Sequence, residues 1–189
     1  DKCEAYIREA IQVGEIDATM LDAFSGLDEV LEDDFREPVP TGITGIDNLL
    51  DGGLAKGEIG VFLAPTGVGK STILTKVANT AYNLGYNVLH VFFEDNPKII
   101  QRKHITCWTG ISSKEQSTRK DEVMERIEKY QGRGKLLLEK LPSDTMNVGQ
   151  IKNKIRKLIA EDIKIDLVVL DYIDCLLPDR VFSDEWKGE

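Results

Sequence analysis

The chain has 189 residues, of which 41% are hydrophobic and 30% charged, and its formal net charge is −9. This length supports one principal domain with a sizeable core and a short appendage. The acidic balance argues against a surface coated with nucleic acid, because non-specific binding needs Lys and Arg to neutralise phosphates. No apolar run is long enough to span a bilayer and the first residues do not resemble a secretion signal, so we expect a cytoplasmic protein that binds no membrane.

Two short amphipathic patterns precede the first expected strand. Apolar residues recur at helical spacing over residues 3–11 and again over residues 20–31, before acidic residues and prolines interrupt the pattern near residue 38. We therefore expect a helical linker or tether over residues 1–37, which packs on its own domain or docks on a neighbouring subunit. The main domain is expected over residues 38–189, with its C-terminal part missing.

From Gly57 onward, strands and helices are expected to alternate. Ile59–Leu63 is a continuous apolar run, the pattern of a strand that is buried on both faces. Further strands are expected at residues 88–93, 136–138 and 165–170. Helices are expected at residues 73–81, 97–110, 123–130 and 147–159, the last opened by a capping box of Asn147 and Gln150. This alternation predicts an α/β fold with a mainly parallel sheet flanked by helices.

The strongest functional signal is the segment between the first expected strand and the first expected helix of this region, where a P-loop belongs. Gly67 and Gly69 would let backbone N–H groups approach a triphosphate closely. Lys70 would contact the β and γ phosphates, and the hydroxyl of Ser71 would bind Mg²⁺. The motif departs from its usual form at Ala64, where glycine is usual. The expected nucleotide-binding residues are Ala64, Pro65, Thr66, Gly67, Val68, Gly69, Lys70, Ser71 and Thr72.

Two acidic residues follow strands of the same expected sheet. Asp171 ends an apolar run in the pattern typical of a Walker B motif, and strand ends of this kind face ligands in α/β sheets, so Asp171 is predicted to hold Mg²⁺. Glu94 follows the strand at residues 88–93. If that strand lies between the strands of the P-loop and of Asp171, Glu94 would polarise the attacking water. A rival interpretation is that Glu94 or Asp95 only stands at the start of the next helix, where the helix dipole favours acidic residues.

These residues, in this order, resemble the motor domain of DnaB-type replicative helicases, which belong to the wider RecA-like ATPase superfamily. The resemblance runs from about Pro38 to Pro178. Its specific parts include Val39–Asp47, Phe92–Glu94 and Leu170–Tyr172. It implies a RecA-like P-loop fold, preceded by a short helical linker, that uses ATP and Mg²⁺ with Glu94 and Lys70 as catalytic residues.

The resemblance also implies a quaternary structure and partners. The family forms a hexameric ring that hydrolyses ATP between subunits and moves 5′ to 3′ along single-stranded DNA, with a primase and a helicase loader as further possible partners. Arg180 and Lys187 fall where the family has a DNA-facing loop, so they are candidate phosphate contacts, although a solvated loop fits the acids nearby equally well. The family places its arginine finger beyond this stretch, so we expect this chain alone to be a poor ATPase.

Other functions stay open at this point. A RecA-like or RadA-like recombinase or a clock-type ATPase would share the fold, and a small-molecule P-loop kinase would share the loop. A non-enzymatic nucleotide-binding loader is less compatible with Glu94. The basic residues Lys152, Lys154, Arg156 and Lys157 are expected on a solvated helix face, and His90 and His104, which have no partner motif, are expected to be structural.

Overall fold

A computed structural model describes residues 22–32, 36–143 and 145–178. The contacts divide the chain into two units, residues 1–35 and 36–189, and each is described by itself. In the first unit, helix α2 spans Leu27–Glu32. The exposed Phe24 lies in the turn before α2, so the stripe expected over residues 20–31 is wrong as one continuous helix; its described part is helical from Leu27 onward. The helix expected over residues 3–11 lies outside the described residues.

The second unit is built on a parallel sheet that has three strands in its described part. Strand β1 (Val88–Phe92) is central, with β2 (Leu136–Lys140) on one side and β3 (Leu167–Asp171) on the other. Val88 lies opposite Leu136 and Leu167, so the three strands begin at the same edge of the sheet. The α/β fold class with a parallel sheet, predicted from the alternation of apolar patterns, is confirmed.

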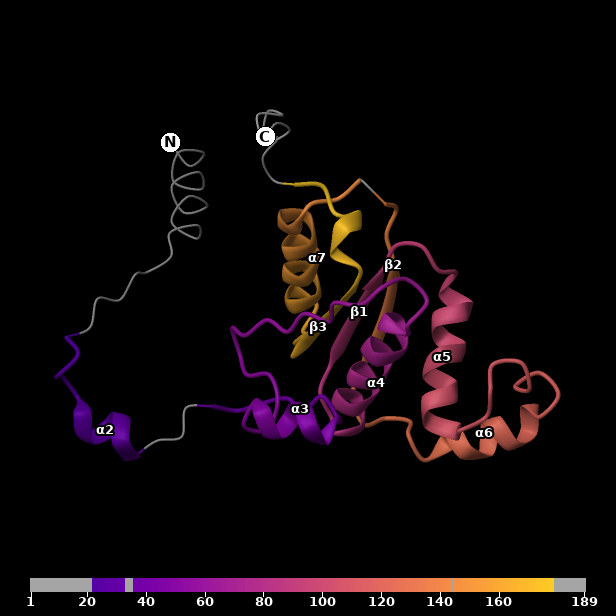
Figure 1. Ribbon diagram of the computed structural model, residues 1–189, viewed down its shortest axis with the longest axis horizontal. Coiled ribbons are helices and arrows are strands. Elements are labelled where there is room, and N and C mark those ends of the chain that lie inside the picture. The colour runs from indigo at the N-terminus through magenta and orange to yellow at the C-terminus, as the bar shows by residue number, and fades with distance from the viewer. Residues whose placement is uncertain (1–21, 33–35, 144, 179–189) are drawn as a thin grey trace. The chain divides into compact units, whose positions relative to one another are not determined.

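Helices flank this sheet on both faces (Figure 1). Helix α7 covers one face, while α4 and α5 pack against each other on the opposite face. The helices of the second unit are α3 (Thr44–Leu49), α4 (Lys70–Asn83), α5 (Pro97–Thr109), α6 (Lys120–Glu128) and α7 (Val148–Ala160), followed by a 3₁₀ turn η1 (Ile173–Cys175). None of the helices in the described ranges is long and apolar enough to cross a membrane.

Local signals explain where two of these helices begin. The side chain of Asn96 accepts a hydrogen bond from Lys98 N, and Pro97 takes the first position of α5, where the missing N–H donor costs nothing. At the start of α7, Asn147 Oδ1 accepts from Gln150 N and Gln150 Oε1 accepts from Asn147 N, both at 2.9 Å. The predicted capping box is thus confirmed, and it satisfies donors that the first turn would otherwise leave free.

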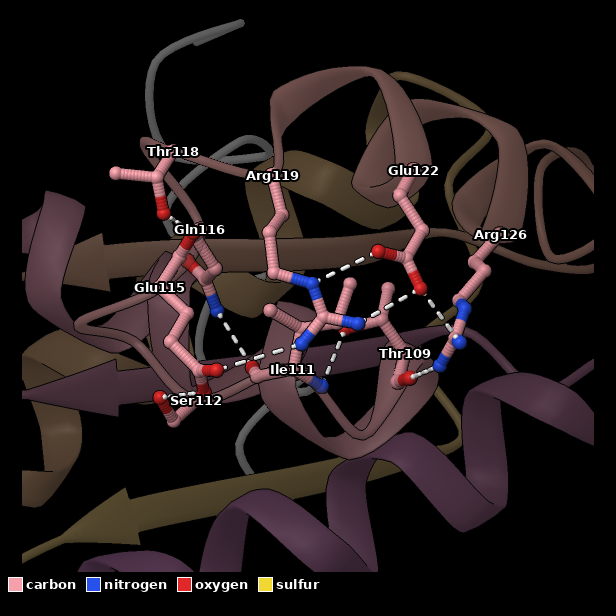
Figure 2. Close-up of polar contacts among 9 residues, drawn as sticks. All are labelled: Thr109, Ile111, Ser112, Glu115, Gln116, Thr118, Arg119, Glu122 and Arg126. Carbon is pink, nitrogen blue, oxygen red and sulfur yellow. Dashed lines mark hydrogen bonds and ion pairs between the residues drawn. The ribbon is translucent and has the colours of Figure 1, made fainter.

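The connection between α5 and α6 is held by a polar cluster (Figure 2). Arg119 donates to both carboxylate oxygens of Glu122 at 2.8 Å and to Glu115 at 3.4 Å. Arg126 donates to Glu122 at 2.7 Å and to the carbonyl oxygen of Thr109 at 2.6 Å. This last bond satisfies a carbonyl at the end of α5 that has no partner within the helix. The cluster therefore fixes how α6 follows α5.

The strand predicted at Ile59–Leu63 is wrong for this structure. The segment has irregular backbone, and the side chains of Ile59, Val61 and Leu63 are 88%, 78% and 96% exposed. An apolar run becomes a strand only when a neighbour takes its backbone hydrogen bonds and covers its side chains. This run pairs with none of the described strands. As a result β1 lies between β2 and β3, not between a P-loop strand and β3.

The segment that leads to this run is folded by its own polar contacts. The Arg36 guanidinium donates to both carboxylate oxygens of Glu58, at 3.0 and 2.9 Å, and to the carbonyl oxygens of Asp51 and Gly53 at 2.7 Å. The Asp47 carboxylate in α3 accepts hydrogen bonds from the Thr41 hydroxyl at 2.6 Å and from Thr41 N at 2.8 Å. These bonds, the one from the hydroxyl most of all, lower the pKa of Asp47. Helix α3, which periodicity does not predict, is thereby anchored to the chain before it.

Candidate active site

The P-loop segment turns sharply into the start of α4. Gly67 and Gly69 have φ angles of 83° and 108°, in the left-handed region that glycine adopts without strain. The carbonyl oxygen of Gly69 accepts hydrogen bonds from Thr72 N and Ile73 N, both at 3.0 Å, and so begins the helix. Thr66, Gly67 and Val68 are exposed at the tip of the loop. The first N–H groups of α4 therefore open towards solvent, where an anion could reach them.

Lys70 folds back over the loop that precedes it. Its Nζ donates to the carbonyl oxygen of Ala64 at 2.7 Å and to that of Pro65 at 3.3 Å. The next residue, Ser71, is half-buried, and its backbone carbonyl accepts from the Thr75 hydroxyl at 2.7 Å. Phosphate oxygens carry full negative charge and bind an ammonium more strongly than carbonyls do. The lysine is thus held at the loop in a position where a phosphate can compete for it.

The start of α4 lies towards the edge of the sheet where the strands finish. α4 ends at Asn83 and β1 begins at Val88, so the chain reverses direction over a short connection. Ala78 and Ala81, in the second half of α4, pack with Val88 at the beginning of β1. The first turn of α4, which contains Lys70, therefore points towards the carboxyl ends of the strands (Figure 1).

Asp171 and Glu94 lie at the carboxyl ends of two neighbouring strands. Asp171 is the last residue of β3 and lies opposite Phe92, two positions before Glu94. The Asp171 side chain is 8% exposed, and its carboxylate makes no hydrogen bond or ion pair with the residues that the structure describes. The two acids are brought to one edge because β1 pairs directly with β3 and both strands run the same way.

Glu94 is exposed, and Tyr172 holds its side chain. Tyr172 Oη donates to Glu94 Oε1 at 3.0 Å, which joins the residue after β3 to the residue after β1. Contacts with Cys175 and with Glu94, in that order, raise the pKa of Tyr172 to about 12, so its hydroxyl keeps the proton that it donates. Lys140, at the end of β2, donates to the carbonyl oxygen of Glu94 at 3.2 Å. All three strand ends therefore contribute to fixing this residue.

The residues at this edge fit a magnesium ion that arrives with a nucleotide. No group of three or more His, Cys, Asp or Glu in the described ranges could enclose a metal. Mg²⁺ keeps several waters and is usually bound through one or two protein oxygens together with substrate phosphates. A buried, unpaired carboxylate at Asp171 and a hydroxyl at Ser71 supply such a partial set.

Among the other residues singled out in the sequence, Arg180 and Lys187 lie outside the described residues. On α7, Lys154 pairs with Glu139, while Lys152, Arg156 and Lys157 are exposed, as expected for a solvated face. Asp95, the rival of Glu94, pairs with Lys103 at 2.6 Å. The Tyr172 contact was missed from the sequence, although Tyr172 stands within the Leu170–Tyr172 segment of the resemblance.

Residues 38–185 match the family described as DnaB-like helicase C terminal domain. The chain belongs to this family. Membership in the DnaB-like family agrees with the RecA-like fold class predicted from the motifs, and the matched residues include the P-loop segment, Glu94 and Asp171.

Parts of the chain are also similar to proteins named DNA repair protein RadA. The RadA protein of Mycobacterium tuberculosis (strain ATCC 25618 / H37Rv) is 33% identical over 98 residues, which is 50% of this chain and 20% of that protein. That of Aquifex aeolicus (strain VF5) is 37% identical over 65 residues, 34% of this chain and 14% of that protein. The match to the mycobacterial protein spans one fifth of its length. Both comparisons indicate an ATPase of the RecA-like class.

Proposed function

We propose that residues 38–189 form the ATP-hydrolysing motor of a DNA helicase that acts in the cytoplasm as a ring, with six subunits as the expected number. The motor moves 5′ to 3′ along single-stranded DNA, residues 1–37 tether it within the ring, and a primase and a loader are its expected protein partners. The proposal depends on one observation. Asp171 ends β3 and Glu94 follows the end of β1, its parallel neighbour, at the edge of the sheet towards which the first turn of α4 points.

Each side chain has a role that follows from its chemistry. Lys70 and the N–H groups of residues 66–72 bind the phosphates of ATP. Ser71 and Asp171 hold Mg²⁺, which neutralises charge on the phosphates when it is bound. Glu94 orients the attacking water and accepts its proton, and Tyr172 fixes the Glu94 carboxylate at 3.0 Å. The exposed position of Glu94 leaves space beside it for that water.

The open face of the site supports assembly into a ring. Glu94 and the tip of the P-loop are exposed, and Val68, an apolar residue at that tip, is 68% exposed. Hydrolysis is most efficient where bulk water is excluded, because electrostatic interactions are stronger there. A neighbouring subunit packed over this face would exclude water and cover Val68. Assembly into a ring would therefore explain why Glu94 and the tip of the P-loop are exposed in a single chain.

A RadA-like DNA repair ATPase is the second candidate function. The observation that favours it is the similarity to RadA proteins, which covers residues of the same domain in several matches. The two functions differ in what ATP hydrolysis accomplishes on DNA. Strand separation of a forked substrate by the complete protein supports the helicase, whereas strand exchange without unwinding supports the RadA-like activity. Neither comparison indicates a small-molecule kinase.

The catalytic assignment is tested by a matched pair of substitutions in the complete protein that contains this domain. Glu94→Gln should lower the rate of ATP hydrolysis by about 10²–10⁴-fold and leave ATP binding intact, because the amide cannot accept the proton of water. Asp95→Asn should change the rate by less than about threefold, since only a surface ion pair with Lys103 is lost. Equal losses in both variants would refute the catalytic assignment, and hydrolysis that single-stranded DNA does not stimulate would refute the DNA motor.

A further inference from the structure

Three buried polar side chains form a chain of hydrogen bonds between β1, α5 and α4. His90, His104 and Asn79 are 0%, 1% and 2% exposed. His90 Nδ1 lies 3.1 Å from His104 Nε2, and His104 Nδ1 lies 2.6 Å from Asn79 Oδ1. Asn79 Nδ2 donates to the carbonyl oxygen of His104 at 3.1 Å. We call this chain of three residues the histidine relay.

The hydrogen-bond partners determine which ring nitrogens carry protons. Because the Asn79 amide nitrogen donates to a carbonyl, its oxygen is the atom that faces His104, and His104 Nδ1 must donate to it. Burial is the main cause that lowers the pKa of His104 to about 3 and of His90 to about 4, so each ring is neutral near pH 7 and carries one proton. His104 Nε2 is then an acceptor, and His90 Nδ1 donates to it.

The same reasoning leaves His90 Nε2 as an unprotonated acceptor. This nitrogen is buried and has no hydrogen-bond partner among the residues that the structure describes. Buried polar atoms in folded proteins are nearly always bonded to protein or to ordered water, because an unmade bond is costly. Thr75, a buried hydroxyl of α4, already donates to the carbonyl oxygen of Ser71 at 2.7 Å. His90 Nε2 therefore needs a donor from another source.

Asp171 is the polar group that β3 places nearest in register. His90 lies opposite Val169, and Asp171, two positions further along β3, points to the same face of the sheet as Val169. The negative charge of Asp171 acts on His90, where it partly offsets the effect of burial on the pKa. Two acceptors cannot bond to each other, but one water molecule can donate a proton to each of them.

We propose that a water molecule bridges His90 Nε2 and the Asp171 carboxylate, so that the histidine relay orients the carboxylate towards the magnesium site. Partners that hydrogen-bond to a metal ligand fix its orientation and strengthen metal binding. His90 is then a positioning residue, which acts through Asp171. The role in magnesium binding rests on the proposed function, whereas the hydrogen bond itself does not.

The hydrogen bond can be tested without nucleotide or metal. Long-range ¹H–¹⁵N spectra of the ¹⁵N-labelled chain report which imidazole nitrogens carry protons. We expect both histidines to be protonated at Nδ1, and Asp171→Ala to shift the Nε2 signal of His90 while leaving that of His104 in place. A proton on His90 Nε2, or a His90 spectrum that Asp171→Ala does not change, overturns the proposal.

The positioning role is tested by two substitutions of the same residue in the complete protein. His90→Asn keeps a donor near the place of Nδ1 and removes the acceptor that faces Asp171, while His90→Gln puts an amide oxygen near the place of Nε2. We expect His90→Asn to raise the Mg²⁺ concentration for half-maximal hydrolysis about tenfold, with kcat at saturating Mg²⁺ within about twofold of wild type. His90→Gln should restore most of the Mg²⁺ affinity.

Each other outcome of the paired test has a distinct meaning. Equal weakening in both variants shows that His90 only packs the core, and no change in either shows that it does not act on Asp171; both results overturn the proposal. Thermal melting followed by circular dichroism verifies that the two variants fold. If the wild-type protein shows no Mg²⁺-dependent hydrolysis, the proposed function fails, and the spectra of the labelled chain still decide whether His90 bonds towards Asp171.

Discussion

The two faces of the sheet are packed by different kinds of side chain. The α7 face is an apolar cluster in which Leu89 and Val91 of β1, and Phe93 just after it, are covered by residues of α7 and the chain around it. The α4 face has apolar residues too, but it also buries the histidine relay, Thr75 and Asp171. Apolar burial stabilises the fold under most conditions, whereas buried polar groups depend on their partners and on pH. The stability of the α4 face, which lies beside the P-loop segment, is therefore the one that depends on pH.

The largest contrast between the faces should appear in activity. Lys70→Ala, at the start of α4, should lower ATP hydrolysis by the complete protein about 10²–10³-fold, because it removes the charge that the proposed function places against the transferred phosphate. Lys152→Ala removes an exposed cation from α7 and should leave the rate within about twofold. Initial rates at saturating ATP measure both. A comparable loss in the two variants would show that net charge, not position, matters.

Stability should respond most strongly on the apolar face. Leu89→Ala should lower the free energy of unfolding by about 2–5 kcal/mol, because it leaves a cavity in a cluster that α7 and its neighbours close. Leu49→Ala, at an 88% exposed position of α3, should change it by less than about 0.5 kcal/mol. Urea denaturation measures both values. Equal effects would mean that the α7 face is not the main source of stability.

Acidification should weaken the polar face selectively. The unfolded histidines have the ordinary pKa of 6.5, above the folded values of about 4 and about 3, so the unfolded state binds more protons between these limits. The free energy of unfolding should therefore fall as pH drops below 6.5, by up to about 2.7 kcal/mol per pH unit if both rings contribute fully. Urea denaturation at several pH values measures this slope.

The slope can be assigned by substitution. His90→Asn removes one of the two titrating rings and should reduce the slope by about half, whereas Leu89→Ala should lower stability without changing the slope. Stability that does not vary between about pH 7 and pH 5 would show that the histidines are not buried as neutral rings.

The smallest effects should be equal on the two faces. Asn147→Ala removes the cap of α7 and Asn96→Ala removes the cap of α5, and each should lower the free energy of unfolding by about 1 kcal/mol. Thermal melts of both variants, with the wild type as reference, measure these losses. A much larger loss at Asn96 would indicate that the loop after β1 contributes to the site beyond capping a helix.

Local signals in the sequence predict most of the elements but not how every segment is paired. α4, α5 and α7 repeat their apolar residues at helical spacing, and asparagine caps mark the start of the last two. The strand expected at Ile59–Leu63 fails because pairing depends on a distant neighbour, which no local pattern specifies. α3 is missed because it is six residues long, too short for a periodic signal, and is held by the Thr41–Asp47 contact.

Some features of the candidate site can likewise be predicted from the sequence, and others cannot. The P-loop and the strand-end acids can be identified from the sequence because their residue types and spacing follow from phosphate and magnesium chemistry. The contact of Tyr172 with Glu94 joins residues 78 positions apart, and the histidine relay joins residues 14 and 25 positions apart on three separate elements. Only the folded sheet brings these groups together, so no spacing rule reveals them.

The outer edge of β3 has a consequence for how the isolated chain behaves in solution. β3 pairs with β1 on one side only, so backbone donors and acceptors along its other side are available to a second molecule within the described structure. The same unit also exposes the apolar side chains of Ile59, Val61 and Leu63. Unprotected strand edges and exposed apolar runs are the usual routes to self-association. We expect concentrated samples to form aggregates, and soluble preparations to require dilute conditions.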